Sequence, residues 1–161
     1  MDAVRELLAE GTFHETTVEG VAARAGVSRA TLYQHFGTRL GLVDAICETF
    51  DENPALVAIR ETDDVDRFLE LVVEFCSSEE KILVQLYGAA AVDPAARALV
   101  ERQRRDRLSE VRRLLKGRPK GFAEVSLLTS FETYIELRRT VGLSKREVVS
   151  TLQRIAKRAL R

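Results

Sequence analysis

The polar side chains between Ser28 and His35 have the types and the spacing to contact a nucleic acid. An arginine can donate two hydrogen bonds to a guanine edge, and a threonine methyl can touch the methyl group of thymine. Hydroxyl and imidazole groups suit phosphate oxygens, which position a protein without specifying a base sequence. We therefore predict base contacts at Arg29 and Thr31, and phosphate contacts at Ser28, Tyr33 and His35.

Two short helices joined by a tight turn are predicted to hold these side chains. Thr16 and Glu19 have the spacing of a capping box, in which each side chain satisfies a backbone N–H at the start of a helix. Gly26 follows that helix, where a left-handed residue often ends it, and Ser28 is a good N-cap for the next one. The expected apolar positions are Val18, Val21, Ala22 and Ala25 in the first helix and Ala30, Leu32, Tyr33 and Phe36 in the second.

A helix that presents its N-terminal residues to base edges is the recognition helix of a helix-turn-helix. The second helix carries Arg29 and Thr31 in its first turn, and Gln34 is one of its outward polar groups. The alternative interpretation is an ordinary helical hairpin inside an all-α core, because helix, short turn and helix is a common order of elements.

The segment from about Val4 to Phe50 resembles the DNA-binding domain of the TetR family of transcriptional regulators. The matching residues are Gly11-Thr12-Phe13, Thr16-Thr17-Val18, Ala25-Gly26-Val27-Ser28, the run from Thr31 to Phe36, Arg39 and Leu42. Arg39 stands where the family usually has a phosphate-contacting Lys, and it keeps the charge while presenting a planar fork. The resemblance implies DNA contacts from Thr17, Ser28, Arg29, Thr31, Tyr33, Gln34, His35 and Arg39.

Two features depart from the family pattern. The resemblance implies a basic stretch before the first helix, whereas this sequence begins with Met1 inside that helix, so we expect the arm to be missing or trimmed. Residues 1–50 also carry four arginines against seven carboxylates, a net charge of minus three. Because DNA binders usually carry a basic surface, we expect the few positive groups to share one face and the binding to be weak.

Charge is balanced over the whole chain but segregated along it. The 161 residues hold 25 Lys plus Arg and 25 Asp plus Glu, so no long-range field draws the molecule to nucleic acid or to an anionic membrane. Acidic residues dominate from Asp44 to Glu80, and basic residues dominate from Arg97 to Lys120 and from Lys145 onward. We interpret these stretches as solvated helix faces that form ion pairs within or between subunits. A second nucleic-acid surface is the alternative.

Several classes of function are disfavoured by what the sequence lacks. No segment approaches the roughly 20 apolar residues that span a bilayer, and no charged start precedes an apolar signal core. His14 and His35 do not have metal-ligand or triad spacing, and there is no phosphate-binding glycine loop or nucleophile elbow. We therefore expect a cytoplasmic protein that is not an enzyme and has no metal, cofactor or membrane partner. Cys47 and Cys76 are expected to be buried free thiols, with a redox pair as the alternative.

The fold class is predicted to be all-α, because no segment alternates as a strand does between turn residues. A three-helix DNA-binding domain is expected over residues 1–46, and a helical ligand-binding and dimerisation domain of about five helices over residues 47–161. After Phe36 we expect a helix from Arg39 to Phe50 and then a linker or short turn from Asp51 to Thr62. The remaining helices are expected to begin at Asp63 or Asp64 and to run from Glu79 to Ala91, from Asp93-Pro94 to Leu115, from Phe122 to Val141 and from Ser144 to Ala159. Ser144 and Glu147 form a second capping box.

The last two helices are the expected dimer contacts, because two amphipathic helices from each subunit can pair into a four-helix bundle. A symmetric dimer sets two recognition helices about 34–36 Å apart, so a near-palindromic DNA operator is the expected partner. The predicted interface residues are Phe122, Val125, Val148, Leu152, Ile155 and Ala159.

The resemblance also implies a pocket for a small hydrophobic effector in the second domain. The candidate lining residues are Phe68, Phe75, Tyr87, Leu128, Phe131 and Tyr134, and the alternative is that they fill the core. We predict a sequence-specific DNA-binding transcriptional regulator, a repressor that an effector releases. The competing hypothesis is a TetR-fold interaction or sensor protein with weak or lost DNA binding.

Overall fold

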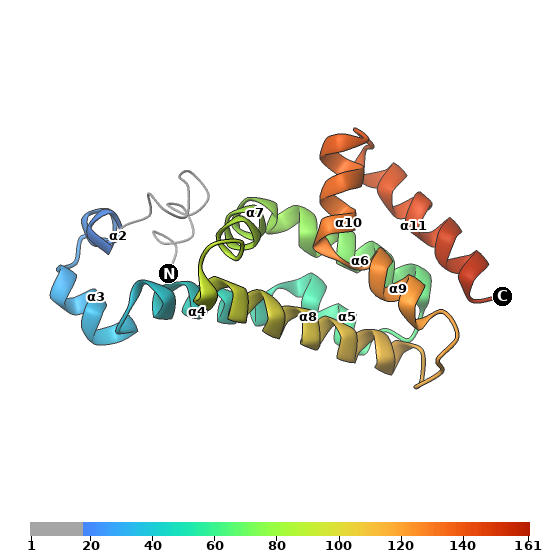
Figure 1. The fold of residues 1–161 in the computed structure, drawn as a ribbon, viewed down its shortest axis with the longest axis horizontal. Helices are drawn as coiled ribbons and strands as arrows, with labels where there is room; N and C mark the ends of the chain where they lie inside the picture. Colours follow the sequence, from blue (N-terminus) through green and yellow to red (C-terminus); the bar gives the residue numbers. More distant parts are fainter. Residues whose placement is uncertain (1–17) are drawn as a thin grey trace. The chain divides into compact units, whose positions relative to one another are not determined.

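The computed structural model describes residues 18–161, apart from the side chains of Val18, Glu19, Arg39, Leu40, Leu42, Val43, Ile46 and Ala95. All regular elements in this described part are helical, as the all-α prediction requires (Figure 1). The chain forms two compact units, one holding the chain up to Glu52 together with Glu80–Glu101, the other holding Asn53–Glu79 and Arg102–Arg161. The domain boundary expected after residue 46 stays a prediction.

The first unit contains the helices that were expected to bind DNA. They are α2 (Val18–Ala25), α3 (Arg29–Phe36) and α4 (Arg39–Thr49), followed by a 3-10 turn (Phe50–Glu52). Helix α3 contacts both α2 and α4. Val21 and Ala22 of α2, Leu32 of α3 and Cys47 of α4 are buried, so each helix turns one apolar side inward. Helix α7 (Glu80–Ala89) and the first part of α8 (Pro94–Leu114) complete the unit.

The second unit is built around α6 (Val65–Ser78). Its other elements are α5 (Pro54–Glu61), the rest of α8, α9 (Phe122–Leu128), α10 (Phe131–Ile135), a π-helical turn (Glu136–Thr140) and α11 (Lys145–Ala159). Helix α6 contacts α5, α10 and α11, and α9 contacts α10 and α11. The most deeply buried side chains of these helices include Phe68, Leu69, Val73 and Tyr134. Removing such apolar surface from water is the main driving force for folding.

The helix starts predicted at Asp63 or Asp64, at Asp93-Pro94 and at Ser144 are confirmed, with Asp64 as the residue that caps the first of them. The Asp64 carboxylate accepts a hydrogen bond from the Arg67 N–H, which makes Asp64 the N-cap of α6. At α11, the Ser144 hydroxyl accepts from the Glu147 N–H at 3.3 Å, and the Glu147 carboxylate accepts from the Ser144 N–H at 2.8 Å. These reciprocal bonds form the predicted capping box.

The linker predicted from Asp51 to Thr62 is wrong, because most of it is helix α5. The Asn53 side chain accepts a hydrogen bond from the Ala55 N–H at 3.0 Å and caps the helix, and Pro54 occupies its first turn. Proline is favoured there because the first N–H groups of a helix have no intrahelical partner. Ala55 and Ile59, one turn apart, are buried, and α5 packs on α6. The Asn-Pro pair that suggested a loop is therefore a helix start.

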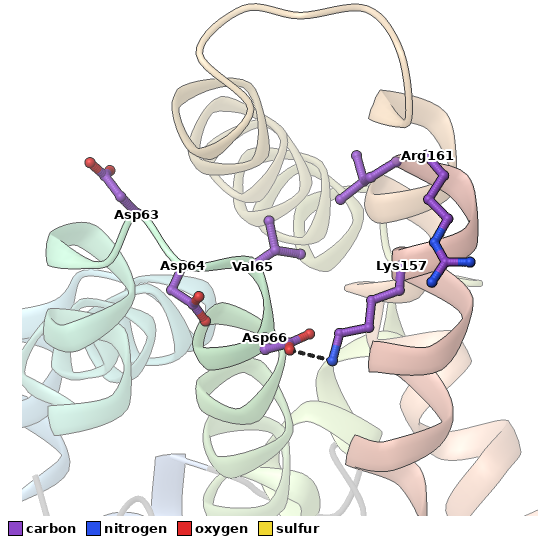
Figure 2. A pocket seen from close by; sticks show the side chains of 7 residues that line it. Asp63, Asp64, Val65, Asp66, Lys157 and Arg161 are labelled. Carbon is purple, nitrogen blue, oxygen red and sulfur yellow. Dashed lines mark ion pairs between the residues drawn. The ribbon is translucent and has the colours of Figure 1, made fainter.

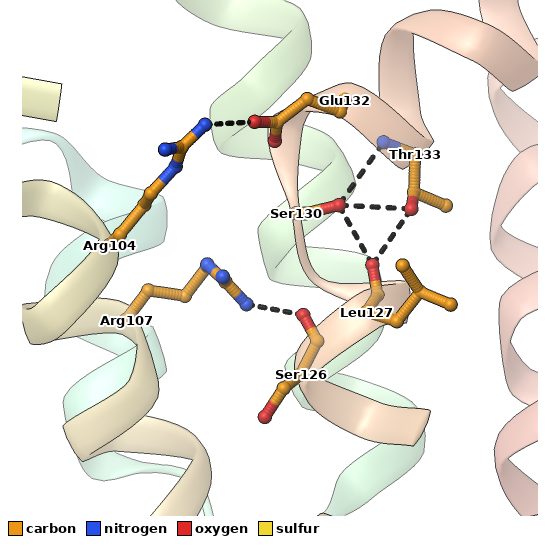
Figure 3. Close-up of polar contacts among 7 residues, drawn as sticks. All are labelled: Arg104, Arg107, Ser126, Leu127, Ser130, Glu132 and Thr133. Atoms are coloured by element: carbon orange, nitrogen blue, oxygen red, sulfur yellow. Dashed lines mark hydrogen bonds and ion pairs between the residues drawn. The ribbon is translucent and has the colours of Figure 1, made fainter. Parts of the chain in front are cut away.

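The single helix predicted from Phe122 to Val141 is also wrong, because it breaks between α9 and α10. The Ser130 hydroxyl caps α10 by accepting from the Thr133 N–H, and it also donates to the Leu127 carbonyl oxygen (Figure 3). From α8, the Arg107 guanidinium donates to the Ser126 carbonyl oxygen and to the Thr129 hydroxyl. The break persists because these groups satisfy backbone atoms that a continuous helix would have paired.

Three of the predicted dimer residues are wrong in that role. Val125, Val148 and Leu152 are fully buried inside the second unit of a single chain, where α9 and α11 pack together. A side chain that its own core already covers has no surface to offer a partner. Ile155 is exposed, and Phe122 and Ala159 are partly exposed, so the interface role of these three stays a prediction.

Candidate nucleic-acid interface

The start of α3 has the capping geometry that the sequence predicted. Ser28 has an extended backbone, and its hydroxyl oxygen accepts a hydrogen bond from the Thr31 N–H at 3.1 Å. The Ser28 and Thr31 hydroxyl oxygens lie 2.9 Å apart and also share a hydrogen bond. Ser28 is therefore the N-cap of α3, and Arg29 is its first helical residue.

The turn before α3 depends on Gly26. This residue has a φ of 66°, in the left-handed region that a glycine adopts without strain. The Val27 N–H donates to the Ala22 carbonyl oxygen at 3.0 Å, a bond that spans the end of α2. Such a bond pairs a carbonyl that the helix itself leaves unsatisfied. The predicted helix end at Gly26 is confirmed, and it lets the chain turn directly into the Ser28 cap.

The outer side of α3 lies on the surface of the first unit. The predicted contact residues Ser28, Arg29, Gln34 and His35 are exposed, as is Tyr33 at 51%, whereas Thr31 is half-buried. Leu32 is buried and anchors the opposite side of the helix. Ala30 and Tyr33, which the sequence suggested as part of the apolar body, are instead exposed. The predicted residues from Ser28 to His35 are thus brought together on one short helix.

The junction between α3 and α4 uses three residues that the sequence argument missed. Gly37 ends α3 with a φ of 66°, and the Thr38 hydroxyl caps α4 by accepting from the Gly41 N–H at 3.1 Å. A Cβ placed on Gly41 would meet the Phe36 carbonyl oxygen at 1.9 Å, so only a glycine fits there. A glycine followed by a threonine is a signal for a helix end and a helix start that could have been recognised.

Two predicted DNA contacts lie outside the residues that the structure describes. These are Thr17 and the side chain of Arg39. For the part that is described, the first turn of α3 contains no acidic residue. The N-terminal end of a helix carries a partial positive charge and exposed N–H groups, which favours an anion such as a phosphate. The arrangement can therefore present Arg29 to a DNA groove without a neighbouring carboxylate from its own helix turn.

The predicted effector lining is divided between the two units. Phe68, Leu128, Phe131 and Tyr134 are buried in the second unit, where the Phe131 and Tyr134 rings stack with centroids 6.1 Å apart. Phe75 is half-buried in the same unit, whereas Tyr87 is half-buried in the first unit. Burial of this kind is shared by a pocket lining and by a solid core, so the effector pocket stays a prediction.

A hollow that the sequence did not suggest lies on the second unit, where α6 begins and α11 ends (Figure 2). It has a volume of about 500 Å³, and its lining is largely charged. The Asp66 carboxylate and the Lys157 ammonium form an ion pair across it at 2.6 Å. The lining residues are Asp63, Asp64, Val65, Asp66, Lys157, Leu160 and Arg161.

The described part of the chain contains neither a membrane span nor a metal centre. Among the helices of residues 18–161, none combines the length and the apolar character needed to cross a membrane. Within the described residues there is also no group of three or more His, Cys, Asp or Glu side chains arranged to hold a metal ion. Cys47 and Cys76 are both buried free thiols, as expected.

Comparison with known proteins shows what the N-terminal part of the chain is similar to. Residues 1–46 match the family model described as bacterial regulatory proteins, tetR family. The HTH-type transcriptional regulator UidR of Escherichia coli K12 is 23% identical over 151 residues, which cover 89% of this chain and 76% of UidR. The resemblance found in the sequence is thereby confirmed, and residues 1–46 are similar to the DNA-binding domain of this family.

Solved structures share the fold over nearly the whole chain. A transcriptional regulator (TerR/AcrR family) from Aquifex aeolicus VF5 superposes with a TM-score of 0.77 at 19% identity, covering 97% of this chain and 94% of the other. A Saccharomonospora viridis protein in complex with choline gives a TM-score of 0.66 at 17% identity, covering 97% and 92%. At these identities the likeness establishes the fold, an N-terminal helix-turn-helix followed by a helical C-terminal part.

Proposed function

We propose that this chain, whose first 46 residues match the model of the tetR family of bacterial regulatory proteins, is a sequence-specific DNA-binding transcriptional regulator. The observation that carries the proposal is the exposed start of α3. Ser28 caps it, Leu32 holds it to the unit's core, and Arg29 sits in its first turn. Base readout needs such a rigid, outward-facing helix end. A regulator of this kind acts where bacterial DNA is held, so we place it in the cytoplasm.

The charge of the N-terminal segment affects how this regulator binds. Residues 1–50 carry a net charge of minus three, so attraction to DNA must come from a small number of arginines. Each phosphate contact releases counterions, and the binding constant then falls as salt rises. We expect a shallow salt dependence compared with that of strongly basic DNA-binding domains, because few phosphates are neutralised.

We propose that the protein binds DNA as a homodimer through α9 and α11. Leu127 of α9 is 65% exposed and Ile155 of α11 is 40% exposed, and these two helices contact each other. An association surface needs contiguous exposed apolar groups, and we propose that these two side chains belong to one such patch. The partly exposed Phe122 and Ala159, which were also predicted at the interface, extend this surface. Two-fold symmetry then calls for a near-palindromic operator.

We also propose that a small hydrophobic effector releases the protein from DNA. The supporting observation is the set of buried aromatic groups Phe68, Phe131 and Tyr134 in the second unit. One protein of this fold is known in complex with choline. An effector shifts the regulator only if it binds the non-operator geometry more tightly than the operator-bound geometry. Stabilisation against heat by a member of a hydrophobic library, weakened by Phe131→Ala, is the expected result, and no stabilisation by any member would remove the effector from this proposal.

The decisive experiment is selection of duplex DNA from a randomised library by the purified chain. The selected duplex is then titrated by fluorescence anisotropy at several salt concentrations. We expect a near-palindromic sequence and a log binding constant that falls linearly with log salt. Sedimentation of the same sample reports whether the dimer is present. A stable dimer that enriches no sequence would favour the competing hypothesis, a TetR-fold interaction or sensor protein without DNA binding.

A further inference from the structure

The chain crosses between the two compact units at three places. One crossing, between Glu101 and Arg102, lies inside helix α8, so the backbone hydrogen bonds of that helix hold it. The other two, at Glu52–Asn53 and at Glu79–Glu80, lie where one helical element ends and the next begins. Because no single helix runs through either of these points, side chains must fix the backbone there.

A polar cluster within the second unit joins these two crossings. The side-chain amide of Asn53 donates a hydrogen bond to the Glu79 carboxylate at 3.0 Å and another to the Ser78 hydroxyl at 3.2 Å. The amide oxygen accepts from the Ala55 N–H at 3.0 Å and so caps α5. One side chain therefore ties the start of α5 to the end of α6.

Helix capping alone does not explain why these residue types occur here. Aspartate and asparagine cap helices about equally well, but only asparagine has N–H groups to donate to Glu79 while its oxygen serves the cap. Glu79 is 6% exposed and is the only charged side chain that is buried among those the structure describes. Burial of a carboxylate is costly unless hydrogen bonds satisfy it. The pairing of a buried carboxylate with an asparagine favours a role for the contact itself.

We propose that Asn53 and Glu79 form a clip that holds together the points at which the chain enters and leaves the second unit, and that this clip sets the operator spacing. The inference rests on the proposed DNA-binding function. A connection at a single point can pivot, whereas two connections tied to each other resist rotation. A dimer that reads two half-sites must hold its recognition helices at one separation, about 34–36 Å. The clip limits the freedom of each DNA-binding unit, so that the homodimer accepts a single half-site spacing.

Asn53→Asp breaks the clip and keeps the cap. The aspartate oxygen still accepts from the Ala55 N–H, but a carboxylate oxygen replaces the donor and repels the Glu79 carboxylate. Addition of Glu79→Gln gives the double variant N53D/E79Q. Its glutamine amide can donate to the aspartate, which restores the hydrogen bond with donor and acceptor exchanged.

Spacing preference is the readout that distinguishes positioning from base reading. The operator selected by the whole unmodified chain is compared, by fluorescence anisotropy, with the same duplex carrying one extra base pair between its half-sites. Joint engagement of two sites can raise affinity by about 100- to 10,000-fold, and we expect N53D to lower the preference for the original spacing by about ten-fold. The double variant should recover this preference.

Two outcomes of this comparison would overturn the clip. The first is equal affinity of the unmodified chain for the two duplexes, which needs no variant protein. The second is a spacing preference that N53D leaves unchanged, or that N53D lowers and the double variant does not recover. Both outcomes leave the base preference of the recognition helix intact, so they do not refute DNA binding.

Arg113→Met controls for a simple loss of stability. Arg113 donates to the carbonyl oxygens of Ile59 and Thr62 at the end of α5, so its loss should weaken the second unit without removing the clip. The spacing preference of this variant should equal that of the unmodified chain. A decrease as large as that of N53D would mean that stability alone sets the spacing, and the inference would be wrong.

Failure of DNA binding itself gives a different result. If the unmodified chain selects no duplex, the proposed function and the role in operator spacing are both refuted. Hydrogen exchange of the whole chain then tests the clip alone. N53D should speed exchange of the Ala55 and Glu79 N–H groups, which are bonded at the start of α5 and the end of α6, and the double variant should slow it again. Equal exchange in the two variants would show that the contact ties nothing together.

Discussion

Gly41 in the first turn of α4 lies directly against the Phe36 carbonyl oxygen at the end of α3. A Cβ on Gly41 would stand 1.9 Å from that oxygen, well inside van der Waals contact. The two helices therefore meet backbone to backbone, with no side chain between them. This close contact sets the position of the recognition helix relative to α4, because neither partner atom belongs to a flexible side chain.

Substitution of Gly41 by alanine should destabilise the first unit by about 1–3 kcal/mol, the usual cost of overpacking. Because relief of the clash must move α3, operator affinity should fall as well. Gly88 provides the control, since it lies in α7 of the same unit and a Cβ added there would meet nothing within 4 Å. Gly88→Ala should stabilise the fold by about 0.4–1 kcal/mol, because alanine reduces the conformational freedom of the unfolded chain. Urea unfolding of both variants shows whether the two changes in stability have opposite signs.

Arg29→Ala should relax base preference at one position of the operator, at a cost of about 1–3 kcal/mol. Arg29 is exposed at the first helical position of α3, the part of a recognition helix that approaches base edges. Arg39→Ala, a change at a predicted phosphate contact, should weaken all sequences alike. Selection from a randomised duplex library with each variant separates the two effects. An Arg29→Ala protein with unchanged preference would remove Arg29 from the base-reading residues.

The capping box of α11 predicts a change in stability at low pH. The pKa of the Glu147 carboxyl lies below its ordinary value, first because of its hydrogen bonding with the Ser144 side chain and then with the Ser144 backbone. A depressed pKa in the folded state stabilises the fold above the pKa of the unfolded chain, about 4.3 for glutamate. This contribution disappears as the pH falls through the lower folded pKa.

Glu147→Gln isolates that contribution, because glutamine can also complete a capping box but does not titrate. The stability advantage of the unmodified protein over Glu147→Gln should be constant near neutral pH and should shrink as the solution is acidified below about pH 4.3. Thermal unfolding midpoints across this range measure it. Parallel loss of stability in the two proteins would mean that the carboxylate does not act through the cap.

Arg113→Met should destabilise the second unit by about 1–3 kcal/mol. The Arg113 guanidinium donates to the Ile59 carbonyl oxygen at 2.7 Å and to the Thr62 carbonyl oxygen at 3.1 Å, both at the end of α5. It also pairs with Asp63 and Glu110. Arg105→Met, an exposed position on the same helix, should change stability by less than about 0.5 kcal/mol. Equal midpoints for the two variants in urea would contradict this role of Arg113.

Leu127→Glu should convert the proposed dimer into a monomer, because a charge would be buried at the centre of the contact. Ile155→Glu on α11 should act in the same way. Val57→Glu is the matched control, since Val57 is also an exposed apolar residue but lies on α5. Sedimentation velocity gives the mass of each species. If all three variants remain dimeric, the subunits associate through a different surface.

Local features of the chain were readable from sequence because their partners lie within a few residues. Gly26 and Ser28 define a turn and a cap, and Ser144 and Glu147 define a capping box three residues apart. Such hydrogen bonds depend on residue type and spacing, and so does the helical periodicity that predicted an all-α fold. The identity of the recognition helix followed from the same local signals.

Long-range packing decided the features that the sequence left open or misassigned. Val125 of α9 and Val148 and Leu152 of α11 are apolar positions that suit a partner subunit or the chain's own core equally well, and only the packing of α9 on α11 assigned them to the core. The break before Ser130 is stable because Arg107, 22 residues away from Thr129 along the chain, donates hydrogen bonds to the Ser126 carbonyl oxygen and to the Thr129 hydroxyl oxygen. Periodicity specifies that a face is apolar, but which surface covers it depends on contacts between residues distant in sequence.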